Sequence, residues 1–204
     1  MRSENRLYFE AELLKALKAL ASACEGVTAT KNKLKFKYGK KYVADIYLDH
    51  IGSADCYILA GGVYGGALYE CMSSHKPPYK SNLFHDACFS FISSGEKGRL
   101  FSRNMSGALP TPTPDRAEDV CDHIATALKA FYVPKIFSCI TPTEHTVDGV
   151  LSSPDDYAYP AVFISCAAKL SSSFDYTEQI KKALGIKKVI KDKSYDLPLL
   201  SSFL

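Results

Sequence analysis

The stretch that decides the predicted fold is Tyr42–Cys71, YVADIYLDHIGSADCYILAGGVYGGALYEC. It reads as a strand, a turn and a second strand that is rich in glycine and aromatic residues, and we place it at the centre of an antiparallel sheet. Its glycines at 61, 62, 65 and 66 match neither the G-x-G-x-x-G pattern nor a P-loop. We therefore expect a bulge, a sharp bend or the close approach of another backbone here, and not a phosphate-binding loop.

The segment Lys33–Tyr38, just before this stretch, alternates lysine with apolar residues. A period of two with one charged face predicts a strand that is half open to water. Gly39-Lys40-Lys41 would turn it into the next strand, in which Tyr42, Ala44, Ile46 and Leu48 continue the apolar face. Asp45 and Asp49 would then share the outer face with the lysines, as expected for an antiparallel pair.

The rest of the chain predicts an α+β fold. An amphipathic helix ends near Cys24, strands follow to about residue 103, and the last two of these are placed at Leu83–Ile92 and Arg99–Arg103. Beyond them the period becomes helical. We expect an N-terminal helix, an antiparallel sheet of four or five strands, and about four C-terminal helices packing on one face. The whole chain, 1–204, is predicted to be one domain, with a sheet part (1–106), a proline-rich connector (107–114) and a helical part (115–204).

Composition narrows the functional classes. The net charge is +3, and the seven cysteines form no C-x-x-C pair. The N-terminal segment MRSENRLYFEAEL has no apolar signal core, so we expect a cytoplasmic protein with reduced cysteines. No apolar run reaches roughly 18 residues, and no membrane span is predicted.

Metal and catalytic motifs are not evident, so we predict no metal site, no cofactor and no enzymatic activity. The close Cys/His pairs are Cys121 with His123 and His85 with Cys88. Zinc sites usually take four ligands as two spaced pairs, and neither pair has the geometry to share an ion. Seven cysteines and five histidines still permit a Cys–His pair in space. A small Cys/His-dependent enzyme therefore remains an alternative.

The lysine-bearing face is the predicted binding surface. Lysines with Tyr47 beside them could hold phosphates and stack bases, so a nucleic-acid-binding protein is a second alternative. Asp45 and Asp49 weaken that interpretation, and nucleic acid is not the expected partner. A chain with many tyrosines and no reactive motif is typical of a protein that binds another protein. The expected partner contacts are Lys35, Lys37, Asp45, Tyr47 and Asp49.

The order of elements resembles a group of small bacterial immunity proteins that neutralise interbacterial toxins delivered by contact-dependent inhibition or type VI secretion. The resemblance is carried by the helix Leu7–Leu20, the hairpin Lys33–Leu48, the strands to Phe101, and the helices within Asp115–Tyr132 and Thr143–Leu184. It implies a protein that binds a cognate toxin domain and occludes its active site. Immunity proteins against basic nucleases are commonly acidic, and this chain is not. The implied toxin face is therefore neutral or acidic, or binding uses the acidic stretch Asp115–Asp122. The sequence leaves the oligomeric state open.

Overall fold

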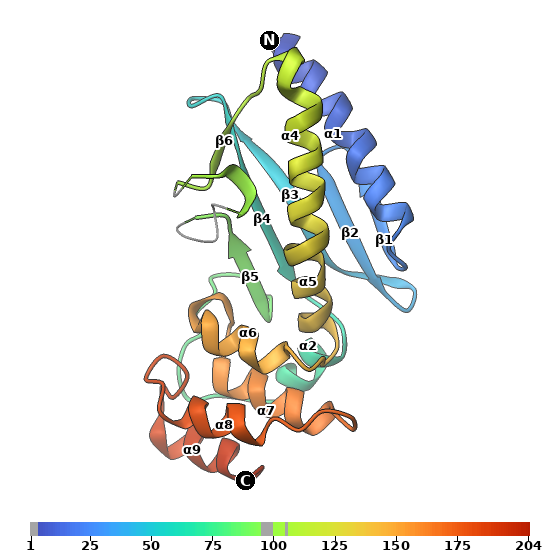
Figure 1. Ribbon diagram of the computed structural model, residues 1–204. Coiled ribbons are helices and arrows are strands. Elements are labelled where there is room, and N and C mark those ends of the chain that lie inside the picture. Colours follow the sequence, from blue (N-terminus) through green and yellow to red (C-terminus); the bar gives the residue numbers. More distant parts are fainter. Residues whose placement is uncertain (1–3, 95–99, 105) are drawn as a thin grey trace. The chain divides into compact units, whose positions relative to one another are not determined.

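The computed structural model describes residues 4–94, 100–104 and 106–204 and confirms the α+β class. The chain divides into two compact units. Unit 1 comprises Met1–Gly61 and Phe91–Pro134, and unit 2 comprises Gly62–Ser90 and Lys135–Leu204. Each unit thus draws on both halves of the chain, whereas the sequence suggested one domain with consecutive parts. The elements of each unit can be followed by colour in Figure 1.

The sheet is antiparallel where its pairing is described, and its strands follow the order β1-β2-β3-β4-β5, with β6 beside β4. The strands of the described residues are β1 (Val27–Thr30), β2 (Lys33–Tyr38), β3 (Lys41–Ile51), β4 (Cys56–Val63), β5 (Phe89–Ile92) and β6 (Ala108–Pro110). The predicted strand at 83–92 is shorter than expected, and β1 was missed. The predicted strand at 99–103 is wrong, because residues 100–102 are helical; Arg99 itself lies outside the described residues.

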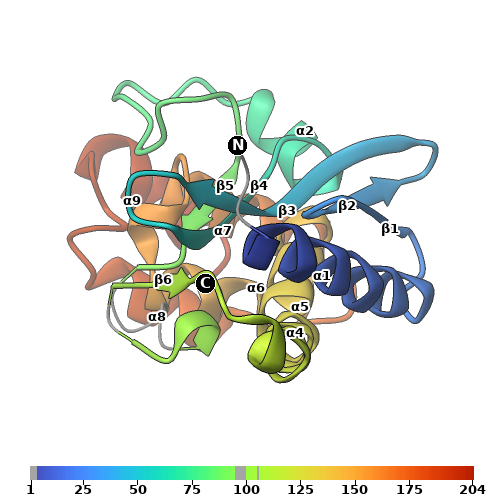
Figure 2. The same cartoon turned by 90° about the horizontal axis from the view of Figure 1, so that it is seen from above.

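One face of the strands in unit 1 is covered by α1 (Glu4–Ser22) and α4 (Pro114–Ala127). Figure 2 shows these two helices side by side on that face. The buried stripe of α1 contains Phe9, Leu13 and Leu17, at the spacing of one helix face. Leu7, an apolar residue of the same helix, is 52% exposed. The close approach expected at the glycines is present at Gly61, where a Cβ would lie 2.7 Å from a β3 carbonyl oxygen.

The helix that begins at Pro114 does not stop at Pro134, although proline usually interrupts a helix. A π-helical turn, η1 (Leu128–Tyr132), joins α4 to α5 (Val133–Ile140). The Val133 amide donates to the carbonyl of Leu128, five residues earlier. Proline has no N–H to donate and its ring crowds the preceding turn. The wider turn lets the helix pass this residue without a break.

Unit 2 is built mainly of helices. At its centre is α7 (Pro160–Leu170), which packs against α2, α6 and α9. Residues 160–167 are all buried, which explains the continuous apolar run seen in the sequence. The remaining elements are α2 (Ala67–Ser73), α6 (Thr146–Ser152), the 3-10 turn η2 (Pro154–Asp156), α8 (Thr177–Leu184) and α9 (Lys193–Ser201).

Helix α2 replaces the second half of the strand predicted at Cys56–Cys71. The strand ends at Val63, and α2 begins directly after Gly66. A Cβ at Gly66 would lie 2.7 Å from a methyl carbon of Ile140, so the close packing at this point requires glycine. None of the described helices has the length and apolar character needed to cross a membrane.

Candidate functional site

The first candidate site is the outer sheet face, which we define as the side chains of Lys33, Lys35, Lys37, Tyr42, Asp45, Tyr47 and Asp49. Strands β2 and β3 pair so that Lys33 lies opposite Tyr47 and Lys35 lies opposite Asp45. Lys37 and Asp49 are exposed, and Lys35, Asp45 and Tyr47 are half-buried. The structure therefore brings the five predicted contact residues onto one side of two neighbouring strands.

Tyr42 joins this face against expectation. The register between β2 and β3 shifts at Phe36/Lys37, and Lys37 then pairs with Tyr42. Val43 is the extra residue of this bulge, and it puts Tyr42 on the opposite face from Ala44. Tyr42, predicted to face the core, is instead 45% exposed.

The ring of Tyr42 makes cation–π contacts with two lysines. The Nζ atoms of Lys35 and Lys37 lie 5.4 and 5.0 Å from the ring centroid. The Thr28 hydroxyl donates to the Tyr42 hydroxyl oxygen at 3.3 Å. This hydrogen bond, with the nearby Lys37 charge, lowers the pKa of Tyr42. The arrangement presents two cations and an aromatic ring together at the surface.

Lys33 has a different role, because its charge is balanced within the face. Its Nζ lies 2.9 Å from Asp45 Oδ2 and 4.9 Å from the centroid of the Tyr47 ring. Lys33 thus contacts both Asp45 and Tyr47. Lys35 and Lys37 consequently dominate the charge of the outer sheet face.

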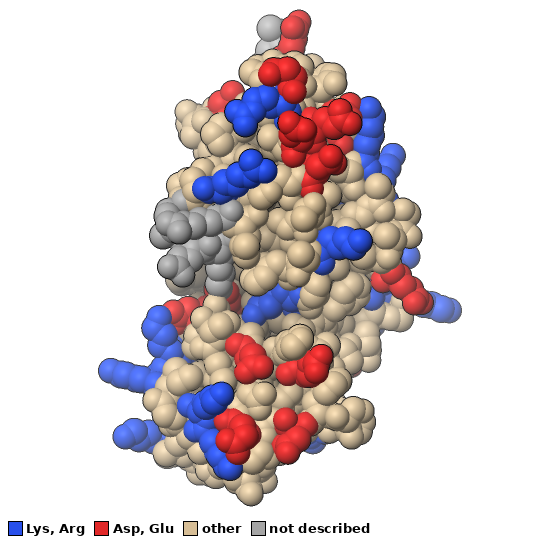
Figure 3. All heavy atoms as spheres, in the orientation of Figure 1, with Lys and Arg blue, Asp and Glu red and all other residues tan. Residues whose placement is uncertain are grey.

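The acidic stretch predicted as another contact region lies on α4. Its exposed acidic residues gather on the face seen in Figure 3: Asp115, Glu118, Asp119 and Asp122. Beside it is a hollow of about 630 Å³, whose walls include Arg103, Arg116 and His123. His123 Nε2 lies 3.1 Å from the carbonyl oxygen of Phe101. That ring nitrogen is therefore engaged by the backbone, and the hollow mixes both signs of charge.

A histidine–carboxylate pair in unit 1 also serves the fold. His50 Nε2 lies 3.1 Å from Asp55 Oδ1, and Asp55 accepts a second hydrogen bond from Thr111 at 2.8 Å. These two partners, Thr111 first, lower the pKa of Asp55. The His50 ring packs edge-on against Tyr57, with centroids 4.9 Å apart. The pair links the β3–β4 turn to the segment after β6, which is a structural use of both side chains.

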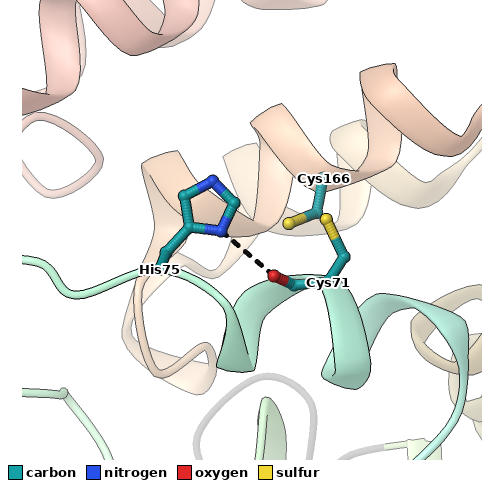
Figure 4. Close-up of side chains that lie close together, drawn as sticks. All are labelled: Cys71, His75 and Cys166. Atoms are coloured by element: carbon teal, nitrogen blue, oxygen red, sulfur yellow. Dashed lines mark hydrogen bonds between the residues drawn. The ribbon is translucent and has the colours of Figure 1, made fainter.

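The second candidate site, which we call the Cys–His cluster, lies in unit 2 and was not foreseen from the sequence. Figure 4 shows Cys71 on α2, His75 just after α2 and Cys166 on α7. One ligand atom of each residue lies within 4.8 Å of the others. Cys166 is buried, and Cys71 and His75 are half-buried. The sequence placed Cys71 at the end of a strand and His75 in the following loop; in the structure, α2 and the turn after it bring the two residues together.

The Cys166 thiol is not activated for nucleophilic attack. Burial, followed by a hydrogen bond with Cys71, raises the pKa of the Cys166 thiol. His75 Nδ1 lies 3.0 Å from the carbonyl oxygen of Cys71. A cysteine nucleophile needs a lowered pKa, so Cys166 is not placed to act as one. Of the pairs named from the sequence, Cys88 is deeply buried with a raised pKa, and burial raises that of Cys121 to about 12.

No protein family, curated protein or solved structure matches this chain.

Proposed function

We propose that this protein is a stoichiometric inhibitor that binds a cognate bacterial toxin domain in the cytoplasm and occludes its active site. The observation that supports the proposal is the outer sheet face, where Lys35 and Lys37 lie over Tyr42. Helices of unit 1 cover the opposite face of these strands, so the outer sheet face stays available to a partner. Tyrosine is enriched at the centre of protein interfaces, and charged residues are typical of the surrounding rim.

The chemistry of this face defines the partner. Lys33 is paired with Asp45, and the remaining charged groups of the outer sheet face, Lys35, Lys37 and the exposed Asp49, leave one net positive charge. The complementary surface would be acidic with an apolar centre, able to bury the rings of Tyr42 and Tyr47. The charges would mainly accelerate association, and the buried rings would supply affinity.

Co-expression with the product of the neighbouring upstream gene tests this proposal. We expect the two proteins to co-purify in equal amounts and the partner's activity to be blocked. The double variant Lys35→Glu/Lys37→Glu should weaken binding, chiefly by lowering the association rate. Lys182→Glu/Lys187→Glu is the matched control, because it makes the same charge change at exposed positions of unit 2.

Two results would refute the proposal. One is a neighbouring product that neither binds nor has toxic activity. The other is equal loss of binding in the sheet-face variant and in the control, which would mean that only net charge matters.

Single-stranded nucleic acid is a second candidate partner, favoured by the outward position of Tyr42. Lysines beside exposed aromatic rings can hold a backbone and stack bases. If Lys35 and Lys37 each neutralise one phosphate, the logarithm of affinity should fall with the logarithm of salt concentration with a slope of about −1.4. A fluorescent oligonucleotide titration at several salt concentrations measures this slope. Undetectable binding at low salt would eliminate this candidate.

A further inference from the structure

We propose that Cys71, His75 and Cys166 form a zinc-binding site in unit 2. The two thiols and the imidazole come from two facing helical segments, and their ligand atoms lie within 4.8 Å of one another (Figure 4). Such convergence of sulfur and nitrogen atoms is characteristic of sites for zinc and is poorly suited to calcium or magnesium, which prefer oxygen. This site is separate from the outer sheet face and does not depend on the toxin proposal.

The distances permit an ion after a small adjustment. Zinc–sulfur bonds of about 2.3 Å in a tetrahedron put two sulfur atoms about 3.7 Å apart. The observed limit of 4.8 Å therefore requires shifts of roughly 1 Å, which side-chain rotation can supply. His75 follows the last turn of α2, outside the regular helix, so its backbone is less constrained than that of Cys166 within α7.

The ring of His75 is already held near the thiols. Its Nδ1 lies 3.0 Å from the Cys71 carbonyl oxygen and 3.3 Å from Ser74 Oγ. Binding of the ion through Nε2 would keep the contact with the carbonyl, which is the usual supporting bond of a zinc-binding histidine. Binding through Nδ1 would replace it. In either case the imidazole starts in contact with the segment that carries Cys71.

Charge balance also favours a divalent ion. On binding, each thiol forms a bond from sulfur to Zn²⁺ and releases its proton to the buffer, so the ion, two thiolates and a neutral imidazole sum to zero. A neutral site suits Cys166, which is buried among apolar residues of α7. Because Cys71 and His75 are half-buried, the fourth coordination position would face solvent and take water or an external ligand.

Zinc titration of the whole protein tests the site. The protein is stripped with a chelator, kept reduced with a phosphine, and titrated with Zn²⁺ against a chromogenic chelator. We expect one ion per chain, with Co²⁺ substitution giving thiolate-to-cobalt charge-transfer absorption. Cys71→Ser and His75→Gln should each weaken affinity by more than about 100-fold, since loss of even a supporting residue weakens it roughly 10- to 100-fold.

Matched controls separate the site from general thiol or imidazole binding. Cys24→Ser removes another half-buried thiol, and His145→Gln removes an exposed imidazole; both should bind zinc as the unaltered chain does. Zinc should raise the melting temperature of the unaltered protein and of the controls, but not of the Cys71 or His75 variants. Both site variants change half-buried residues, so a folded variant is expected.

Three results would overturn the proposal. They are substoichiometric zinc in the reduced protein, equal affinity in Cys71→Ser and Cys24→Ser, and a Cys71–Cys166 disulfide as the resting state of protein purified under reducing conditions. Mass spectrometry of the intact chain detects the last of these by the loss of two hydrogens.

Discussion

The β2–β3 pair of unit 1 and the helical part of unit 2 satisfy their backbone polar groups in different ways. In unit 1 the strand ladder pairs the backbone, and lysines and tyrosines of β2 and β3 are left facing outward. In unit 2 side chains perform this task. Asp196, with 0% exposure, accepts from the Tyr79 hydroxyl at 2.6 Å and from the amides of Lys191 and Asp192 at 2.8 and 2.9 Å.

A second buried side chain of unit 2 also forms hydrogen bonds with backbone groups. Thr146, 1% exposed, donates to the Ser138 carbonyl at 2.9 Å and accepts from the Thr143 amide at 2.8 Å. Side chains that complete backbone hydrogen bonds are committed to the fold. The lysines and tyrosines of the outer sheet face are therefore available to a partner, whereas Asp196 and Thr146 are not.

The largest loss of stability is expected at Gly107 in unit 1, where the backbone packing leaves no room for a side chain. Gly107 has φ +69, and an added Cβ would lie 1.2 Å from the carbonyl oxygen of Ser93. Gly107→Ala should lower the free energy of unfolding by about 4 kcal/mol, from backbone strain and overpacking together. Urea unfolding measures this loss. Gly39→Ala is the control, with φ +60 and no atom within 4 Å, and a loss similar to the control's would contradict the steric explanation.

The next effect is at Asp196 in unit 2, where a side chain should matter most. Asp196→Ala leaves a hydroxyl and two amides without their acceptor and should lower the free energy of unfolding by about 3 kcal/mol. Asp196→Asn keeps one oxygen acceptor and should lose less. A double-mutant cycle with Tyr79→Phe isolates the 2.6 Å contact. Additive losses in that cycle would show that the pair is not coupled.

Alkaline pH should destabilise both units through their buried tyrosines. Burial raises the pKa of Tyr132 in unit 1 to about 12, and burial followed by Asp196 raises that of Tyr79 in unit 2. The unfolded chain, with an ordinary tyrosine pKa of 10.0, loses these protons first. The stabilisation is therefore complete below pH 10 and falls as the pH rises toward 12. Urea unfolding at several pH values checks this, and Tyr79→Phe should flatten the dependence; an unchanged slope would contradict it.

The smallest effect is expected on the outer sheet face. Lys35→Ala and Lys37→Ala should change the free energy of unfolding by less than about 0.5 kcal/mol, because both side chains reach solvent and their main contact is with the exposed Tyr42 ring. Thermal unfolding measures the change. A loss near 2 kcal/mol at either position would mean that these lysines maintain the fold, and it would remove the contrast between the units.

Features that depend only on neighbouring residues could be predicted from the sequence. Alternation in Lys33–Tyr38 identified β2 and the lysine face, and the continuous apolar run at Pro160–Leu170 identified α7. These features depend on local periodicity, which one segment of chain contains completely. The five predicted contact residues follow from that same alternation.

Only the tertiary structure decided what depends on packing between distant segments. The bulge at Phe36/Lys37 turned Tyr42 outward, and the contact of Gly66 with Ile140 accompanies α2 where a strand was expected. With α2 packed on α7, Cys71 and His75 meet Cys166. A periodic pattern within one segment does not predict such a contact. Residues far apart in sequence come together only when the helices that carry them bury their apolar faces against each other.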